Sequence, residues 1–363
     1  MDKRVSMVLF LLLMAVSVLS DVADGKAKDI ATLSRLDRKL KLLNKPAVKS
    51  IKSEDGDIID CVDINKQPAF DHPALRNHKI QMRPSFDLPT EKLDTRNESS
   101  QPVIQQTWQK SGSCPEGTVP IRRIRKQDLL RAASLEQFGI KPPNVPYASN
   151  KTDIKNIISP PSINNTKFQV LSTINRSCAV LVTEGHYYTG AQGEINLWNP
   201  TVDLPDDYTT AQIWLKAGYG EIYESVEAGW MDTNTGNWWL KCGQHYEVVV
   251  GYWPKELFAY LWRSASFVEW GGEVYSPNIV RDRSPHTKTQ MGSGSITQTL
   301  EDDSVASIRI VRIMDTTRKL KYPEWVGTWS DEQYCYSALN HVPGNNVEPV
   351  FYFGGPGQGP QCK

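Results

Sequence analysis

Apolar and polar residues alternate from residue 266 to residue 275, and this pattern predicts a β-strand whose successive side chains point to opposite faces. One face carries Phe267, Glu269, Gly271, Glu273 and Tyr275, and the other carries Val268, Trp270, Gly272 and Val274. The second set is apolar and suits a protein core. Glycine weakens a strand unless it marks a bulge or a close approach to the backbone. The paired glycines therefore indicate either a groove with an acid in its floor or a solvated polar face with a bulge.

The C-terminal half repeats such patterns many times. From about residue 167, short runs rich in aromatic and β-branched residues alternate with Gly and Pro turns, which favours an all-β sandwich or barrel. The expected strands cover residues 168–173, 179–183, 194–198, 211–216, 225–231, 238–241, 246–252, 266–275, 306–314 and 350–353. One helix is expected around residues 254–264, because Leu257, Tyr260 and Leu261 share a helical face.

The first half has a different pattern. Leucine and isoleucine residues three or four apart predict an amphipathic helix over residues 29–45, which Pro46 ends. A short strand is expected at 58–64 and a second helix at 127–138. Residues 139–166 are rich in proline. That composition suits an exposed linker, and exposed linkers are where processing proteases cut.

The N-terminus predicts secretion. Lys3 and Arg4 precede a short apolar run, and the small residue Ser20 fits the end of a signal peptide over residues 1–20. The run is too short to span a bilayer, so no membrane association is expected after cleavage. Four Asn-X-Ser/Thr sequons fit the same route, at Asn97, Asn150, Asn164 and Asn175.

Charge and cysteine content narrow the function classes. The chain has 41 basic and 41 acidic residues, and this balance excludes electrostatic capture of nucleic acid or of an anionic membrane. Its six cysteines are widely spaced and form no Cys-x-x-Cys pair. Disulfides are therefore expected in place of a zinc site.

An ordered series of motifs runs through both halves. The first half contains LLNKPAVKSI at 42–51, DIIDCV at 57–62, HPAL at 72–75 and GSCPEGTVPIRR at 112–123. The second half contains INLWNP at 195–200, AQIW at 211–214, VEAGW at 226–230, GYWP at 251–254, WGGEV at 270–274, QMGSG at 290–294 and GGPG at 354–357. In this order they resemble the neprosin family of plant secreted proteins, with its activation peptide in the first half and its peptidase domain in the second.

The resemblance implies a mainly β protein, in which a small α+β propeptide domain precedes an antiparallel β-sandwich peptidase domain. The expected domains are the propeptide at 21–138, the linker at 139–166 and the peptidase at 167–363. The implied activity is a glutamic endopeptidase that is made as a zymogen, cleaves after proline and works in acid. Its location would be extracellular, in the apoplast or cell wall. Its partners would be proline-containing peptides and its own propeptide, with no cofactor and no metal.

The family motifs place the two catalytic glutamates at Glu227 and Glu273. Two carboxyl groups that face one water can hydrolyse a peptide bond, because one takes a proton from the water while the other polarises the carbonyl. Close carboxylates cannot both be charged, so one stays protonated. Glu269 is the alternative partner, since it shares a strand face with Glu273. Further candidates are amide donors to the oxyanion, Gln212 and Gln290, and aromatic groups that could stack on substrate, Trp230 and Trp270; ordinary surface or core roles are an open alternative for each.

The interval between the two glutamates is much shorter than in the family. A strand-rich block with its own disulfide is absent between Trp230 and Asp232. Three hypotheses follow: a working, shortened peptidase, a secreted β-sandwich of the cell wall that binds without cutting, or the product of a truncated gene model. If the absent block lies away from the groove, Glu227 and Glu273 are expected on neighbouring strands of one sheet.

Within this frame we expect two disulfides. Cys335–Cys362 would bracket the last hairpin beside the C-terminus, and Cys61–Cys114 would lie wholly in the propeptide. The two remaining cysteines, Cys178 and Cys242, are expected to pair with each other. The propeptide is expected to pack over the groove until the linker is cut.

Overall fold

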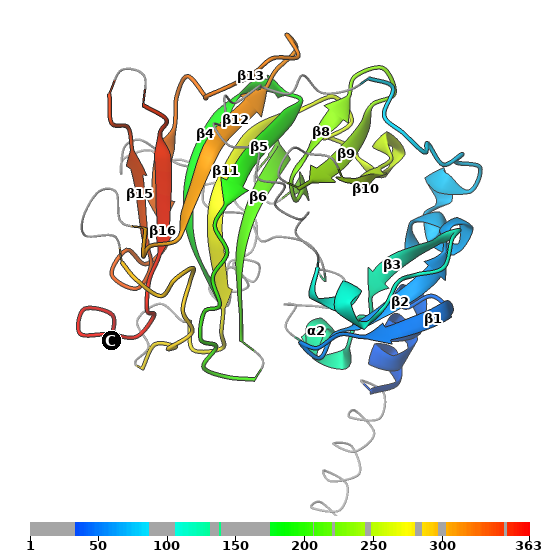
Figure 1. Ribbon diagram of the computed structural model, residues 1–363, viewed down its shortest axis with the longest axis horizontal. Helices are drawn as coiled ribbons and strands as arrows, with labels where there is room; N and C mark the ends of the chain where they lie inside the picture. Colours follow the sequence, from blue (N-terminus) through cyan, green and yellow to red (C-terminus); the bar gives the residue numbers. More distant parts are fainter. Residues whose placement is uncertain are drawn as a thin grey trace, which may run out of the picture. The chain divides into compact units, whose positions relative to one another are not determined.

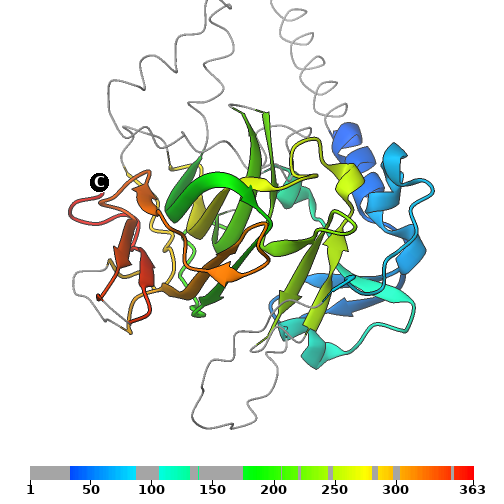
Figure 2. The same ribbon diagram turned by 90° about the horizontal axis from the view of Figure 1, so that it is seen from above.

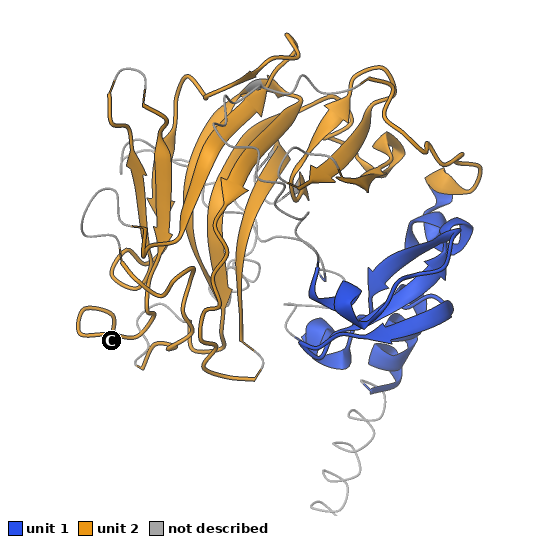
Figure 3. Cartoon of the chain, viewed as in Figure 1, with its two compact units in different colours: residues 1–73, 105–138 blue, residues 74–104, 139–363 orange. Residues whose placement is uncertain are grey.

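The structure is a computed structural model that describes residues 33–86, 106–130, 138, 175–205, 207–219, 222–243, 248–279, 285–296, 303–344 and 347–363 (Figure 1). The chain divides into two compact units, residues 1–73 with 105–138 and residues 74–104 with 139–363 (Figure 3). Four predictions fall outside the described residues: the signal peptide at 1–20, the linker at 139–166, the strand at 168–173, and the sequons at Asn97, Asn150 and Asn164.

The first unit is a small α+β fold. A helix over residues 33–43 precedes an antiparallel sheet of order β1-β2-β3, with β1 at Ala47–Lys52, β2 at Ile58–Asp63 and β3 at Thr118–Arg122. The 3₁₀ turns η1, η2 and η4 lie at Ile64–Lys66, Pro68–Asp71 and Thr107–Ser111, and α2 covers Lys126–Leu130. The turn η3 at Pro73–Leu75 begins at the last residue of this unit before the chain passes into the second. Both expected helices are found in part, because residues 29–32 and 131–137 are not described. The strand expected at 58–64 is found as β2.

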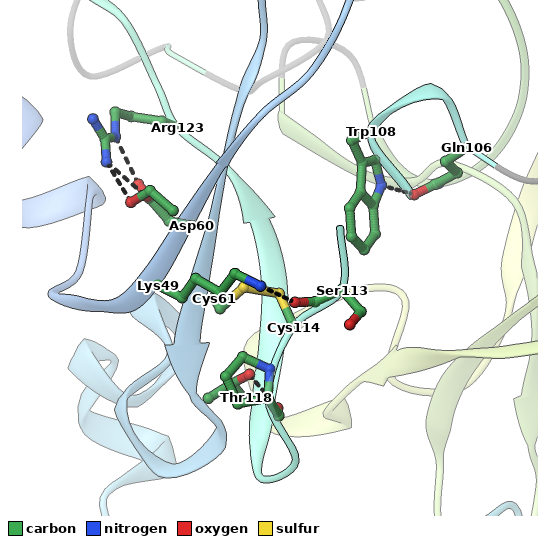
Figure 4. The surroundings of a disulfide bond; sticks show 11 residues. Lys49, Asp60, Cys61, Gln106, Trp108, Ser113, Cys114, Thr118 and Arg123 are labelled. Carbon is green, nitrogen blue, oxygen red and sulfur yellow. Dashed lines mark hydrogen bonds and ion pairs between the residues drawn. A yellow bond between two sulfur atoms is a disulfide. The ribbon is translucent and has the colours of Figure 1, made fainter. Parts of the chain in front are cut away.

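A disulfide and an ion pair stabilise this sheet (Figure 4). Cys61 of β2 bonds Cys114, with their Cα atoms 5.4 Å apart, as expected from the sequence. The guanidinium of Arg123 donates to both oxygens of Asp60, at 2.6 and 2.7 Å. Burial acts to raise the pKa of Asp60, but hydrogen bonds from Arg123 and Ser50 outweigh it and lower the pKa.

The second unit is built from two antiparallel sheets (Figure 1; Figure 2). The five-stranded sheet has the order β14-β4-β11-β6-β7, and the eight-stranded sheet has the order β10-β9-β8-β5-β12-β16-β15, with β13 paired to β12. The strands are β4 Arg176–Tyr188, β5 Gly190–Ile195, β6 Tyr208–Tyr219, β7 Ile222–Val226, β8 Gly229–Asp232, β9 Asn237–Cys242, β10 Val248–Trp253, β11 Ala265–Tyr275, β12 Ser307–Met314, β13 Leu320–Lys321, β14 Gly327–Ser330, β15 Ser337–His341 and β16 Val350–Gly354. The predicted fold class, mainly β with antiparallel sheets after a small α+β region, is confirmed.

The core lies between these sheets. Inward residues of β11, among them Val268, Trp270 and Val274, are fully buried together with Ile308 of β12 and Phe353 of β16. The alternation predicted for residues 266–275 is therefore correct. Burial of such large apolar side chains is the main favourable contribution to folding.

The two glycines of β11 have packing roles. A Cβ atom on Gly271 would lie 2.1 Å from the backbone oxygen of Ala179 in β4, and one on Gly272 would lie 2.7 Å from the side chain of Met291. What approaches the backbone here is therefore the protein itself. Both glycines are buried, so the close approach expected at this point is made by neighbouring strands and side chains.

The helix expected around residues 254–264 is not formed. A short 3₁₀ turn, η6 at Lys255–Leu257, is followed by bends and turns. The carboxylate of Glu224 accepts the backbone N–H groups of Ala259, Tyr260 and Leu261 at 2.6 to 2.9 Å. Those donors therefore bind a side chain in place of helical carbonyls, and Leu261 is directed into the core.

The shortened region between Trp230 and Asp232 closes as a hairpin. Strand β8 pairs with β9, and both Thr235 and Gly236 donate their backbone N–H groups to the carbonyl oxygen of Asp232, at 3.1 and 2.6 Å. Trp230 lies opposite Gly190 of β5. Strand β8, which contains the junction, and its neighbour β9 are therefore both part of the eight-stranded sheet.

Candidate active site

Glu273 is a buried carboxylate at the centre of the five-stranded sheet. It lies on β11 opposite Thr210 of β6 and Cys178 of β4, and its exposed fraction is 6%. Its Oε1 accepts hydrogen bonds from the Tyr208 hydroxyl at 3.1 Å and from Arg176 at 3.4 Å. The Cys178 thiol lies 3.7 Å from Oε2. Buried charges need such partners, and here Arg176 and Tyr208 supply them.

Tyr208 is held as a hydrogen-bond donor beside this acid. Burial raises the pKa of Tyr208 far above its ordinary value, and the negative charge of Glu273 raises it further. The phenol therefore keeps its proton in acidic and neutral solution. Its ring stacks on Tyr275, with ring centroids 5.3 Å apart, and the Arg176 guanidinium lies 5.8 Å from the centroid.

Glu227 lies at a crossing between the two sheets. Val226, the last residue of β7, is opposite Leu215 and faces the core. Glu227 follows the strand and is exposed, and its carboxylate reaches Gln212 of β6. Ala228 then adopts a positive φ of 72°, an uncommon conformation for a residue with a side chain. Gly229 has no room for a Cβ atom, which would lie 2.5 Å from the Trp239 carbonyl oxygen.

Gln212 contacts Glu227 from the strand that is paired with β11. It lies on β6 directly opposite Gly271, and its amide nitrogen donates to Glu227 Oε2 at 2.8 Å. Its amide oxygen accepts a hydrogen bond from Thr210 at 3.0 Å, which orients the nitrogen toward Glu227. Gln212 and Glu273 are diagonal neighbours, a relationship that separates Cβ atoms by roughly 7–8 Å.

Glu273 lies on β11 and Glu227 follows β7, so the two glutamates do not lie on adjacent strands. Strand β6 lies between β7 and β11, so the expectation of neighbouring strands is wrong. One intervening strand adds about 4.8 Å of lateral distance, and the Gln212 side chain lies in that interval. A water or a peptide between the two acids would therefore also contact this amide.

Glu269, the alternative partner, is already neutralised. It is 3% exposed, and its carboxylate forms a buried ion pair with Lys216 of β6. Trp214 lies directly opposite it and is also buried. Glu269 therefore has a buried partner of its own, whereas Glu227 is exposed and bonds Gln212.

The other three candidates for substrate or oxyanion binding have structural contacts of their own. Trp270 faces the core and donates its ring N–H to the Gln192 carbonyl at 2.9 Å. Trp230 is 3% exposed in a separate cluster with Trp239 and Met314. Gln290 exchanges two hydrogen bonds of 2.9 Å with the backbone of Thr201. Their burial and contacts do not support contact with substrate.

The cysteines are partly as expected. Cys335 bonds Cys362, with Cα atoms 5.1 Å apart. Cys178 and Cys242 do not bond each other, which corrects the third expected pair: Cys178 is buried beside Glu273 and Cys242 is exposed on β9. His286 lies within 4.8 Å of the sulfurs of Cys335 and Cys362. Their disulfide leaves no thiolate for a metal at that point.

Two partners of Glu273 escaped the sequence analysis. Tyr208, Thr210, Gln212, Trp214 and Lys216 alternate along β6, and extending the expected strand 211–216 by three residues would have found Tyr208. Arg176 begins β4, outside the expected strand 179–183, and no local signal marks it. Its role depends on pairing between β4 and β11.

Comparison with known families agrees with this architecture. The neprosin activation peptide model matches residues 50–171, and the neprosin model matches residues 230–356. The second match includes Glu273 and begins just after Glu227. An activation peptide joined to this domain indicates a family of peptidase zymogens. In the described part of the chain, no helix is long and apolar enough to cross a membrane. The order of the two matched segments, together with the mainly β fold, shows that the chain belongs to the neprosin family.

Proposed function

We propose that the protein is a secreted glutamic endopeptidase that cleaves after proline in acid and is made as a zymogen. The observation that supports this proposal most is the hydrogen bond from Gln212 to Glu227, because Gln212 lies on β6, the strand paired with the one that carries Glu273. Family membership supports the peptidase class. Proline preference and acid operation rest on the resemblance of the VEAGW and WGGEV motifs.

The contacts of each acid support different roles. Glu273 has donors from Arg176 and Tyr208 that compensate a negative charge, so it acts as the base that takes a proton from water. Glu227 is exposed and, in its protonated form, polarises the scissile carbonyl. Gln212 donates an N–H group toward the developing oxyanion, a contribution that catalysis uses strongly when the donor is preorganised.

Two aromatic rings beside Glu273 suit a proline side chain. Tyr208 and Tyr275 are stacked and partly exposed, and the apolar face of either ring can pack against a pyrrolidine. Tyr208 does not compete for the proton of the water, because burial raises its pKa and keeps it protonated. Specificity for proline would then arise next to the base.

The proposal also includes secretion and synthesis as an inactive zymogen. Two disulfides, one in each unit, suit an oxidising compartment. The activation region is the protein's own first partner, and a cut in the proline-rich segment 139–166 would separate it from the peptidase chain. Proline-containing peptides are the second partner.

A second candidate is a secreted binding protein without activity. The burial of Glu273, together with its contact to Arg176, favours this alternative, because an acid that substrate does not reach cannot activate water. The two candidates differ in one measurable property, hydrolysis of a proline peptide by folded protein in acid.

The test compares three purified proteins after acid incubation, namely wild type, Glu227→Gln and Glu273→Gln. Wild type is expected to cleave a proline-containing peptide on the carboxyl side of proline, as located by mass spectrometry between pH 3 and 7. Each variant should lose at least about 10²-fold in rate, the contribution typical of a general acid or base. Glu194→Gln, an exposed acid on the other sheet, is the matched control.

Two results would decide against the dyad. If folded wild type leaves the peptide intact across the pH range, the binding candidate is correct. If wild type cuts but either glutamine variant retains its rate, the corresponding glutamate has been wrongly assigned. Circular dichroism on each protein separates loss of activity from loss of fold.

A further inference from the structure

Residues 78–86, here named the strap, belong by sequence to the segment matched by the activation peptide but belong structurally to the second unit. The strap runs beside the β8–β9 turn and β10. This division is unexpected for an activation peptide that is simply discarded, because part of it is integrated into the unit that carries the candidate active site.

The first anchor of the strap is Asp232, at the end of β8. Its carboxylate is completely buried. It accepts the backbone N–H of Ser85 at 2.7 Å, the Ser85 hydroxyl at 2.6 Å and the Gln81 amide at 3.2 Å. Hydrogen bonds to a charged acceptor are stronger than neutral ones, so three of them from one segment form a specific contact.

The second anchor is Tyr252 of β10. Its hydroxyl accepts the backbone N–H of Gln81 at 2.8 Å and lies 2.7 Å from a ring nitrogen of His78. Asn237 donates to the Gln81 side-chain oxygen at 2.8 Å. Gln81 is therefore hydrogen-bonded by three residues: Tyr252 contacts its backbone N–H, and Asn237 and Asp232 contact its side-chain oxygen and nitrogen.

The third anchor is apolar. Phe86 packs against the buried cluster of Trp230, Trp239 and Met314. The guanidinium of Arg318 lies 4.6 Å from the centroid of the Phe86 ring. Departure of the strap would uncover apolar surface and remove three hydrogen bonds from Asp232, and both effects oppose release.

We infer that Asp232, Tyr252 and the Trp230 cluster form a peptide-binding site separate from the candidate active site, with the strap as its ligand. The chemical class of ligand is an extended peptide with a glutamine, a serine four residues later and an aromatic residue next to it. It follows that an activation region cut between residues 139 and 166 stays bound to the peptidase unit without a covalent link. This consequence rests on the proposed function only in assuming that the linker is cut.

No disulfide joins the two fragments that such a cut would produce. Cys61 bonds Cys114 on one side, Cys335 bonds Cys362 on the other, and Cys178 and Cys242 both lie on the C-terminal side and outside any disulfide. Retention of the N-terminal fragment would therefore report non-covalent binding alone.

The experiment uses the full chain with a recognition sequence for a site-specific protease inserted between residues 150 and 160. Added protease makes the cut, so the result does not depend on activity of the protein itself. The C-terminal fragment is immobilised, and release of the N-terminal fragment is timed at pH 7. The fragment is expected to remain bound, and the double variant Gln81→Ala with Ser85→Ala should release it at least tenfold faster.

Control variants make the outcome decisive. Met82→Ala changes a strap side chain that is 72% exposed and should leave release unchanged. Phe86→Ala should accelerate release as the double variant does. Asp232→Asn is less informative alone, because Asp232 also accepts the Asn234 N–H of its own turn at 3.1 Å. Immediate release of the wild-type fragment, or equal release from the double variant and wild type, would overturn the inference.

Discussion

The amide nitrogen of Gln212 lies 2.8 Å from the carboxylate oxygen of Glu227, although the two residues come from β6 and from the crossing after β7. The contact places a neutral donor beside an exposed acid, on the same face as buried Glu273. This hydrogen bond can be tested separately from the two proposed catalytic residues.

Gln212→Ala should lower kcat/KM for a proline peptide by about 10²-fold, the loss typical of one preorganised oxyanion donor. Thermal unfolding should change little, because Glu227 is exposed and can bind water in place of the amide. Steady-state kinetics at acid pH measures the first effect and calorimetry the second. Gln192→Ala, on β5 of the other sheet, is the control. A variant with unaltered kcat/KM would exclude Gln212 from the reaction.

Tyr208→Phe should reduce kcat about tenfold while KM stays near the wild-type value. The substitution keeps the ring stacked on Tyr275 and removes the hydroxyl that donates to Glu273 at 3.1 Å. Loss of a hydrogen bond to a charged group should also lower the unfolding free energy by about 1.5–3 kcal/mol. Tyr275→Phe keeps the same stack and is the control. Equal kinetics for the two variants would contradict the role given to the Tyr208 hydroxyl.

Lys216→Met should destabilise the protein by about 3–5 kcal/mol, because it leaves the Glu269 carboxylate buried without its ammonium partner. The double variant with Glu269→Leu should recover much of that loss, since an apolar pair needs no compensation. Urea unfolding of the two single variants and the double variant measures this coupling. Strictly additive losses would show that the ion pair contributes nothing specific. Glu269→Gln should retain the catalytic rate per folded molecule.

His286 should stabilise the protein more in acid than in alkali. Burial acts to lower the pKa of His286, but hydrogen bonds with Glu332 and with the Thr287 carbonyl outweigh it, and the net pKa is raised. Both ring nitrogens face acceptors, at 2.9 and 3.1 Å, so only the cationic ring satisfies both. Because the folded pKa exceeds the unfolded one, the contribution is complete below about pH 6.5 and is lost as pH rises through the folded pKa.

His286→Gln tests this pH dependence. The difference in melting temperature between wild type and variant should be larger at pH 5.5 than at pH 9, as measured by calorimetry in buffers of equal ionic strength. His341→Gln, on β15 and partly exposed, serves as the control. A difference that stays constant or grows toward alkaline pH would contradict the assignment of a charged His286.

The sequence by itself determined local features. Period-two alternation assigned the two faces of β11, because a strand must direct successive side chains to opposite sides. Gly271 and Gly272 were recognised as points of close approach, since only a residue without Cβ tolerates it, although what approaches them is the protein's own interior. Ordered motifs identified the family, and the two expected disulfides, Cys61–Cys114 and Cys335–Cys362, are both present.

Tertiary structure decided the rest. The helix expected around residues 254–264 is replaced by turns because Glu224, more than thirty residues away, captures its backbone donors. The placement of β6 between Glu227 and Glu273, and of Arg176 beside Glu273, follows from strand order. Strand order is set by pairing between segments far apart in the chain. The alternation of side chains within one strand is the same whichever strand lies next to it, so it does not predict strand order.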